Sequence, residues 1–317
     1  MTGRSVLVLT RLDDPDADAV ITQLHHRDVP AVRFDPGLDY RQCLEISARY
    51  DGLGVSGWIR TPTRHLDLAA VQSVYYRRLS PWARPEGLSA EHAQFAADQA
   101  QFGLGGVLAA LPCRYVSGPS NIARAEYKPA GLAAARLAGF TVPAALITNR
   151  LAEAQAFAAQ YPGIVYKPLR SPRLSDAHGG PVTVWTQVVD PGQLDDGVAA
   201  CPHLFQVRVD KVMDVRTTVA GGQAFSARID SPHLDFRSDY SAARYSVIDT
   251  PAPVVVSCRR YLEHFGLMFG AFDFGVDRAG CWHFFECNPN GQWGWIEQET
   301  GLPIAAAIAR LLDQAES

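Results

Sequence analysis

The chain contains 317 residues, 47% of them hydrophobic, which suits a globular protein with one large core or two to three smaller ones. The formal net charge of −4 is spread without a block of like charges, so the sequence excludes an electrostatic surface for nucleic acid or for an anionic membrane. The longest apolar run near the start, Val6 to Thr10, is too short for a signal sequence or a membrane span, and we expect a cytoplasmic protein.

The first 80 residues alternate between strand and helix patterns. Residues 5–10 are typical of a buried strand, and residues 16–28 carry apolar side chains at helical spacing. Three further apolar runs, at 29–35, 52–59 and 73–79, indicate strands. This strand–helix–strand order predicts a small α/β domain with a partly parallel sheet.

A long amphipathic helix is predicted over residues 91–112, with Phe95, Phe102 and Leu108 among its apolar side chains.

Two shorter helices should follow, the first ending near Tyr127 and the second beginning at Lys128. Proline is accepted at the first position of a helix, which explains Pro129. Gly139 suits the residue that ends the second helix.

The segment from 140 to 210 contains a small group of strands with one helix. Residues 144–148 and 163–169 indicate strands on either side of a helix at 151–161. The second strand contains Lys167, a cation inside an otherwise apolar run, whereas a lysine taken singly is usually a solvated surface residue.

Two segments come after this strand. Residues 171–180 are rich in turn formers and lack periodicity, which indicates a mobile loop. Residues 181–189 indicate a strand whose alternation places Trp185 beside polar Thr183 and Gln187, either as part of a binding surface or as an ordinary strand.

The C-terminal third begins with a strand at 203–210 and a hairpin pinched at Gly221–Gly222. Helices are predicted at 255–266 and 303–314. The six cysteines show neither a C-x-x-C pair nor zinc-ligand spacing, so we expect buried thiols rather than disulfides.

A second hairpin, between the two helices, carries three oxygen-bearing side chains. Strand alternation places Phe284, Glu286 and Asn288 on one face, and the turn at Gly280 folds Asp273 back toward them. Two carboxylates and an amide suit Mg²⁺ held together with substrate phosphates. The alternative is a half-exposed sheet with an ordinary polar face.

The order of these features resembles the ATP-grasp ligases from about Tyr115 to the end of the chain. The residues that carry the resemblance are Y-K-P at 166–168, D-V-R at 214–216 and F-F-E-C-N-P-N-G at 284–291. The implied fold class is α/β, with an ATP-grasp fold of two α+β subdomains that clamp ATP. The earlier part resembles a small α/β pre-ATP-grasp domain with its long helix. The implied boundaries are 1–114 and 115–317, with a small lid subdomain at about 140–210. Within that subdomain the loop at 171–180, next to Lys167, would close over the triphosphate of ATP.

More narrowly, the chain resembles the graspetide, or microviridin-type, synthetases, which cross-link ribosomally made peptides. Four short motifs carry this resemblance: V-Y-Y-R-R at 74–78, I-T-N at 147–149, L-D-F-R at 234–237 and N-P-N-G-Q-W at 288–293. The sequence departs from the pattern at Pro129, after the helix-opening lysine, and at Phe236, where tryptophan is more usual. Val207 stands where many ligases of the wider superfamily carry an acid.

The resemblance implies a role for each candidate site residue. Lys128 and Lys167 would meet the α- and β-phosphates of ATP, and Arg216 and Arg237 the transferred phosphate, unless each arginine pairs with its neighbouring acid. The adenine edge would meet a hinge strand. The other nucleotide contacts are Gln206, Val207, Val209 and, for the ribose hydroxyls, Asp210. The implied magnesium ligands are Asp273, Glu286 and Asn288.

The implied cofactors are ATP and Mg²⁺, with two ions expected. The expected reaction activates a side-chain carboxylate of a precursor peptide as an acyl phosphate, and a hydroxyl or amine of the same peptide then forms an ester or amide. We expect recognition of a leader segment near Pro181 to Val189 and the helix around Phe95 to Leu111. Trp293 and Trp295 would either line the peptide site or belong to the core.

Partners other than the peptide are not indicated, although a homodimer stays open, and neither nucleic acid nor a membrane is expected. The alternative function is an ATP-grasp ligase that joins a free amino acid to a carboxylate, as in glutathione synthesis or protein glutamylation. A non-catalytic nucleotide-binding or peptide-carrier module is a third hypothesis, which the complete set of candidate ligands disfavours.

Overall fold

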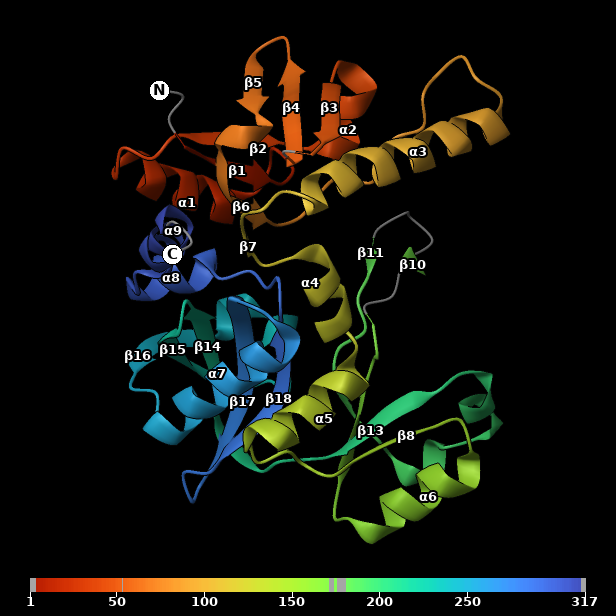
Figure 1. Cartoon of the computed structure of the whole chain (residues 1–317). Helices are drawn as coiled ribbons and strands as arrows, with labels where there is room; N and C mark the ends of the chain where they lie inside the picture. Colours follow the sequence, from red (N-terminus) through yellow and green to blue (C-terminus); the bar gives the residue numbers. More distant parts are fainter. Residues whose placement is uncertain (1–3, 53, 171–173, 176–180, 315–317) are drawn as a thin grey trace.

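The computed structural model describes residues 4–52, 54–170, 174–175 and 181–314. Figure 1 shows three parts: an N-terminal domain, a small subdomain and a larger subdomain, with the last two helices lying between the N-terminal domain and the larger subdomain. None of the helices in the described ranges is long and apolar enough to cross a membrane.

The N-terminal domain is built on a parallel sheet of four strands in the order β2-β1-β6-β7. Strand β1 (Ser5–Leu9) pairs with β2 (Ala31–Phe34) and β6 (Val71–Tyr76), and β6 also pairs with β7 (Arg114–Val116), all in parallel. Helix α1 (Pro15–His25) connects β1 to β2, with Asp14 as its cap. The predicted α/β domain with a parallel sheet is therefore confirmed.

A second sheet in this domain was only partly predicted. Strands β3 (Glu45–Asp51), β4 (Gly54–Thr61) and β5 (Arg64–Asp67) form an antiparallel meander after the short helix α2 (Pro36–Gln42). Only β4 was expected. Most side chains of β3 are exposed, so its sequence lacks the apolar run that indicates a buried strand.

The long helix α3 (Ala90–Ala109) closes the domain, at its expected position. Its buried face consists mainly of alanines, with Leu104 and Leu108, while Phe95 and Phe102 are 64% and 78% exposed. The chain then adds β7 to the first sheet, so the expected boundary at residue 114 falls at the first residue of a strand of that sheet.

Helices α4 (Pro119–Ala125) and α5 (Lys128–Ala138) lead away from the N-terminal domain. The predicted break between them and the start at Lys128 are confirmed, with Pro129 in the first turn. Helix α5 ends at Gly139, whose φ of +96° lies in the left-handed region that favours glycine.

The small subdomain contains an antiparallel sheet in the order β12-β9-β13-β8. Its strands are β8 (Ala145–Thr148), β9 (Ile164–Lys167), β12 (Gln187–Val188) and β13 (His203–Val207), and helix α6 (Leu151–Gln160) covers one face. The strand predicted over 181–189 is not continuous. It is limited to β11 (Pro181–Val182), which pairs with β10 (Leu174–Ser175), and to β12.

The larger subdomain contains a five-stranded antiparallel sheet in the order β16-β15-β14-β17-β18. These strands are β14 (Lys211–Ala220), β15 (Gln223–Asp230), β16 (Arg244–Ile248), β17 (Phe269–Asp277) and β18 (Trp282–Asn288). Both predicted hairpins are present, and Gly221, Gly222 and Gly280 have positive φ in their turns. Helix α7 (Ala252–Phe265) and α5 pack on the sheet through one aromatic-rich core.

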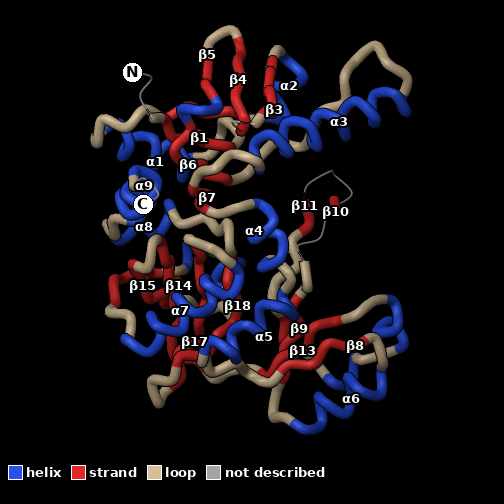
Figure 2. Tube along the Cα trace, viewed as in Figure 1, coloured by secondary structure: helices blue, strands red, loops and turns tan. Residues whose placement is uncertain are grey.

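Helices α8 (Gly294–Thr300) and α9 (Ile304–Asp313) end the described chain, and Figure 2 shows both against the N-terminal domain. Their apolar side chains share a core with β1 and α1, in which Trp293, Ile304 and Ile308 are fully buried beside Val20 and Leu24. The first and last segments of the chain are thus parts of one hydrophobic cluster.

The cysteines form no disulfide, as expected, but they are not uniformly buried. Cys258 and Cys287 are buried in the larger subdomain, whereas Cys43 and Cys201 are exposed.

Candidate active site

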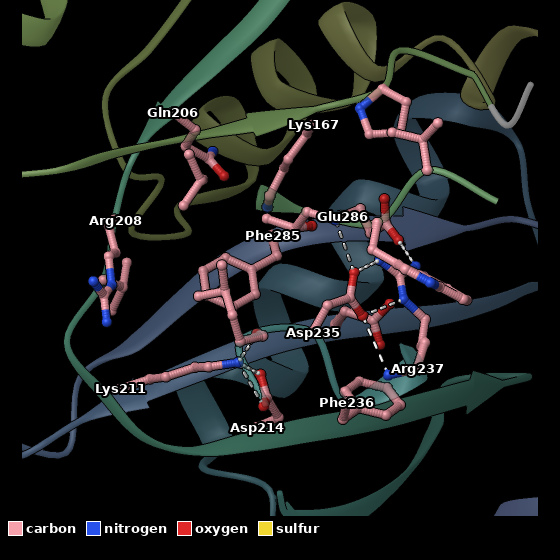
Figure 3. A pocket seen from close by; sticks show the side chains of 18 of the residues that line it. Lys167, Gln206, Arg208, Lys211, Asp214, Asp235, Phe236, Arg237, Phe285 and Glu286 are labelled. Atoms are coloured by element: carbon pink, nitrogen blue, oxygen red, sulfur yellow. Dashed lines mark hydrogen bonds and ion pairs between the residues drawn. The ribbon is translucent and has the colours of Figure 1, made fainter. Parts of the chain in front are cut away.

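A cavity lies between the small and larger subdomains (Figure 3), with a volume of about 970 Å³ that includes space open to solvent. Its lining comes from β9, the segment 183–186, β13, the start of β14, the segment 234–237 and the β17–β18 hairpin. Basic and acidic side chains both line it: Lys128, Lys167, Arg208, Lys211 and Arg237, together with Asp214, Asp235, Asp273 and Glu286.

The β17–β18 hairpin places its two carboxylates opposite each other, as the sequence predicts. Asp273 pairs with Glu286, and one step further Phe274 pairs with Phe284, so Phe285 is an extra residue in β18. This bulge interrupts the alternation. Phe285 and Glu286 both line the cavity, while Phe284 turns into the core, and the prediction that Phe284 shares a face with Glu286 was wrong.

Glu286 lies between two cations. Its Oε1 accepts a hydrogen bond from Nη1 of Arg237 at 2.8 Å, and its Oε2 forms an ion pair with Nζ of Lys128. Burial alone would favour the protonated acid, but the positive charges of Lys128 and Arg237 outweigh it and hold the pKa of Glu286 well below its usual value. Glu286 is therefore an anion in this site.

Asp273 pairs with Arg216, whose Nη1 lies 2.7 Å from the carboxylate. The amide Nδ2 of Asn288 lies 3.4 Å from the other carboxylate oxygen. Burial raises the pKa of Asp273 even though Arg216 opposes the shift. A carboxyl in this position would gain from additional positive charge, which a divalent cation can supply.

Lys167 differs from the other cations of the cavity. Among the described residues it forms no ion pair, and its Nζ lies 4.4 Å from the ring centroid of Phe285. Gly275 opposite leaves room for that ring, because a Cβ there would lie 2.5 Å from Cζ of Phe285. Burial lowers the pKa of Lys167 to about 8, with Glu286 opposing the shift.

These residues fit magnesium and phosphate. Three oxygen-bearing side chains from adjacent strands form a hard-ligand set, which Mg²⁺ prefers. Around them stand Lys128, Lys167 and Arg237, and the buried Nε of Arg216 has no hydrogen-bond partner in the described part of the chain. The site combines a carboxylate centre with cations suited to a polyanion.

Comparison with known proteins agrees with this geometry. Residues 5–123 match the family model of the MvdD pre-ATP grasp domain. The macrocyclase MdnC from Microcystis aeruginosa MRC, crystallised with the precursor peptide MdnA, superposes with a TM-score of 0.85 at 25% identity, over 98% of this chain and 99% of that one. The chain has an ATP-grasp fold that follows an N-terminal MvdD-type pre-ATP-grasp domain.

Two further ATP-grasp structures show the same fold. A RiPP-associated ligase from Chryseobacterium gregarium, in complex with ADP and a leader and core peptide, gives a TM-score of 0.88 at 24% identity, over 99% of this chain and 98% of that one. PsnB, complexed with a minimal precursor, Mg and ADP, gives 0.77 at 21% identity, with the same coverage. No curated protein sequence matches the chain.

In this ATP-grasp fold, the predicted hinge is the connection between the two subdomain sheets. Gln206, Val207 and Val209 line the cavity as expected. The amides of Val207 and Arg208 donate to the carbonyls of Ala144 and Gly163, at 2.8 and 3.0 Å. Asp210 is exposed and lies outside the set that lines the cavity.

Lys211 was not predicted as a site residue, and Asp214 and Asp235 were considered only as acids that could pair with Arg216 and Arg237. Lys211 donates to Asp214 at 2.6 Å and to the carbonyl of Leu234 at 2.7 Å. Burial raises the pKa of Asp214 to about 6, with Lys211 opposing. The guanidinium of Arg237 donates two hydrogen bonds of 2.8 Å to the carboxylate of Asp235. Asp235 is thus the neighbouring acid that the sequence offered as a partner of Arg237, whereas Arg216 pairs with Asp273.

The segment 183–186 lines the cavity with all four of its residues, so the alternation predicted for a strand there was wrong. The loop expected to close at 171–180 lies outside the described residues, apart from Leu174–Ser175 in β10.

The two tryptophans after the hairpin have different surroundings. Trp293 is fully buried and belongs to the core. Trp295 is half-buried in a group of aromatic rings with Phe236, Tyr240 and Tyr245. That group begins one residue before Arg237, so it borders the charged part of the site.

Proposed function

We propose that this protein is an ATP-dependent ligase that cross-links side chains of a ribosomally made precursor peptide. The observation that carries the proposal is the arrangement of Lys128, Lys167 and Arg237 around Glu286 and Asp273, in a cleft of an ATP-grasp fold. Support comes from the match to the macrocyclase MdnC over nearly the whole of both chains.

The proposed reaction has two steps. A carboxylate oxygen of the peptide attacks the γ-phosphorus of ATP, the bond to the bridging oxygen breaks, and ADP leaves with that electron pair. A hydroxyl or amine of the same peptide then attacks the acyl carbon, phosphate leaves, and the proton of the nucleophile passes to solvent. The product is an ω-ester or ω-amide. Such a reaction needs positioning and charge neutralisation more than a protein nucleophile.

Each residue has a role that follows from its charge and place. Lys128 and Lys167 neutralise the α- and β-phosphates, while Arg216 and Arg237 stabilise the transferred phosphoryl group. Mg²⁺, as one or two ions, would be held by Asp273, Glu286 and Asn288 and would offset negative charge on the phosphates. Gln206, Val207 and Val209 face the adenine. Asp210 is exposed and lies outside the residues that line the cavity, so its contact with the ribose hydroxyls stays a prediction.

The peptide is proposed to bind through a leader segment as well as at the reacting side chains. The predicted leader surfaces are Pro181 to Val189 and the helix around Phe95 to Leu111. On α3, Phe95 and Phe102 are exposed and provide apolar area for such a contact.

Mass spectrometry of a precursor co-expressed with the protein tests the proposal, since each cross-link removes one water. The candidate is a short open reading frame beside this gene that is rich in Thr, Ser, Glu and Asp. We expect loss of one or more waters with the wild type and none with Glu286→Gln. A precursor that stays unmodified, while free amino acids are ligated to a carboxylate, would establish the alternative function.

A precursor that lacks its N-terminal half tests leader recognition separately. We expect weaker binding and slower cross-linking of the truncated peptide. Equal binding and equal reaction of both peptides would exclude a leader contribution.

A further inference from the structure

A buried cluster of charges lies in the N-terminal domain, close to the last helices. Arg77, directly after β6, contacts Asp14 and Asp16 of the α1 start at 3.2 and 2.7 Å. The three side chains are only 1%, 4% and 6% exposed. Burial by itself disfavours charge, yet Arg77 holds the pKa of Asp14 below its usual value, so the pair is ionised.

This cluster binds the backbone that follows the metal-ligand strand. The amides of Trp293 and Gly294 donate to Asp16 at 3.2 and 3.0 Å, and Nη1 of Arg77 donates to the carbonyl of Gly291 at 3.3 Å. The side chain of Asn290 returns a hydrogen bond to the carbonyl of Arg77 at 2.8 Å. The turn from 289 to 294 is therefore held from the N-terminal domain at four points.

The opposite side of the same turn contacts the candidate active site. Nη2 of Arg216 donates to the carbonyl of Gln292 at 3.1 Å, while its Nη1 holds Asp273. Gly291 leaves no space, since a Cβ there would lie 3.0 Å from Cβ of Asn288 and 3.3 Å from Nη2 of Arg216. A shift of this turn would move both Asn288 and Arg216.

Stabilising the contact between the N-terminal domain and the C-terminal helices does not by itself explain this buried cluster. Burying several charges stabilises a fold less well than apolar packing, and the apolar core next to it already joins these segments. A second ion pair, Arg27 with Asp313 at 2.5 Å, links the segment after α1 to α9, but it is exposed and does not touch the turn. The buried cluster differs by its directed hydrogen bonds to the turn.

We infer that Asp16 and Arg77 are positioning residues for the magnesium and phosphate site, acting through the turn from 289 to 294 on Asn288 and Arg216. The inference rests on the nucleotide site of the proposed function. It also relates two motifs that are far apart in the sequence, because V-Y-Y-R-R contributes Arg77 and N-P-N-G-Q-W forms the turn. Groups that orient metal ligands typically change metal affinity about 10- to 100-fold when they are removed.

The experiment measures binding of the non-hydrolysable analogue AMPPNP by calorimetry over a series of Mg²⁺ concentrations. In Asp16→Asn we expect the Mg²⁺ concentration for half-maximal binding to rise about 10-fold. AMPPNP affinity without Mg²⁺ should fall by a smaller factor, because only the effect through Arg216 remains there. Gly294→Ala perturbs the same contact without changing any charge, because its Cβ would overlap the Asp16 carboxylate, and we expect a shift in the same direction.

Asp313→Asn is the control, since it removes an exposed ion pair between the segment after α1 and helix α9 that does not touch the turn, and its Mg²⁺ dependence should equal that of the wild type. Melting temperatures accompany every variant, and the double variant Asp16→Asn/Gly294→Ala should shift by less than the sum of the single shifts. Unchanged Mg²⁺ dependence in both single variants would overturn the inference while leaving the proposed function intact. A wild type without Mg²⁺-dependent AMPPNP binding would overturn both.

Discussion

On the wall of the cavity formed by β14, β17, β18 and the 234–237 segment, every charged side chain lies beside an opposite charge. Lys167, on the β9 wall, has no such partner among the described residues and rests instead on the ring of Phe285. The first wall is fixed before any ligand arrives, so it suits catalysis by preorganised charge. The second wall holds a cation whose charge is not yet neutralised, so it suits recognition of a polyanion.

The largest effect is expected from the paired wall, with Glu286→Gln. Loss of the carboxylate removes a proposed magnesium ligand and leaves Lys128 and Arg237 without their shared anion, so ATP turnover should fall by at least about 100-fold while the fold is retained. Asn288→Ala should act in the same direction. Steady-state ATPase or ligase assays with Mg²⁺ measure the change, and exposed Glu263→Gln on α7 is the control. Near-normal activity in both site variants would remove the metal assignment.

Substitution on the other wall should weaken nucleotide binding more than it slows chemistry. Lys167→Met removes an unneutralised cation, and we expect about 10-fold weaker ATP binding, as for loss of a charged hydrogen bond. Lys167→Arg keeps the charge and should lose less. Calorimetry with AMPPNP distinguishes the two variants, and equal affinity of Lys167→Met and wild type would show that the phosphates bind elsewhere.

The pH dependence of kcat/KM for ATP tests the charge of Lys167 directly. Burial lowers the pKa of this lysine to about 8, so the free enzyme loses its charge as the pH rises through that value. We therefore expect kcat/KM to decline above about pH 8 in the wild type. In Lys167→Arg the decline should disappear, because a guanidinium stays protonated there. The same decline in both proteins would assign it to another group.

Phe285→Leu should have a smaller effect of the same kind. The ring supports the ammonium of Lys167 through a cation–π contact, which is worth about 1 kcal/mol, or roughly 5-fold in ATP affinity. Exposed Phe95→Leu on α3 is the matched control and should leave ATP affinity unchanged. An effect of Phe285→Leu on kcat alone would contradict a role in holding Lys167.

The smallest effect is expected from the Arg27–Asp313 ion pair, which lies away from the candidate active site and affects only the stability of the fold. Asp313→Asn breaks the exposed contact with Arg27, and the free energy of unfolding should fall by less than about 1 kcal/mol. Urea denaturation measures this difference. A loss of several kcal/mol would mean that exposed pairs hold the two ends of the chain together.

Sequence patterns predicted those parts of the molecule in which local chemistry determines the backbone. Gly139 ends a helix, and Gly221 and Gly222 form a turn, at positions where the backbone has a positive φ that glycine favours. The apolar strands on either side of Gly280 form the hairpin that pairs Asp273 with Glu286. These features depend on neighbouring residues, which a sequence shows directly.

Other features depend on distant parts of the chain and could not be predicted in this way. The bulge at Phe285 arises from the register between β17 and β18, and it reverses the direction of Phe284. On α3, the spacing of the apolar residues does not show which of them face the core, and in the structure the alanines do so while Phe95 is exposed. Arg77 gives no local sign that it reaches the turn at Gly291, 214 residues further along the chain.

The shared core of α1 and α9 also affects how the protein is made. Roughly 280 residues separate the two helices, so a ribosome adding about 5–20 residues per second completes α9 about 15–60 s after α1. Until then Val20 and Leu24 lack the apolar surface that covers them in the finished molecule, and the first domain remains exposed to chaperones or to aggregation. A fragment that stops near residue 123 would keep that exposed surface permanently.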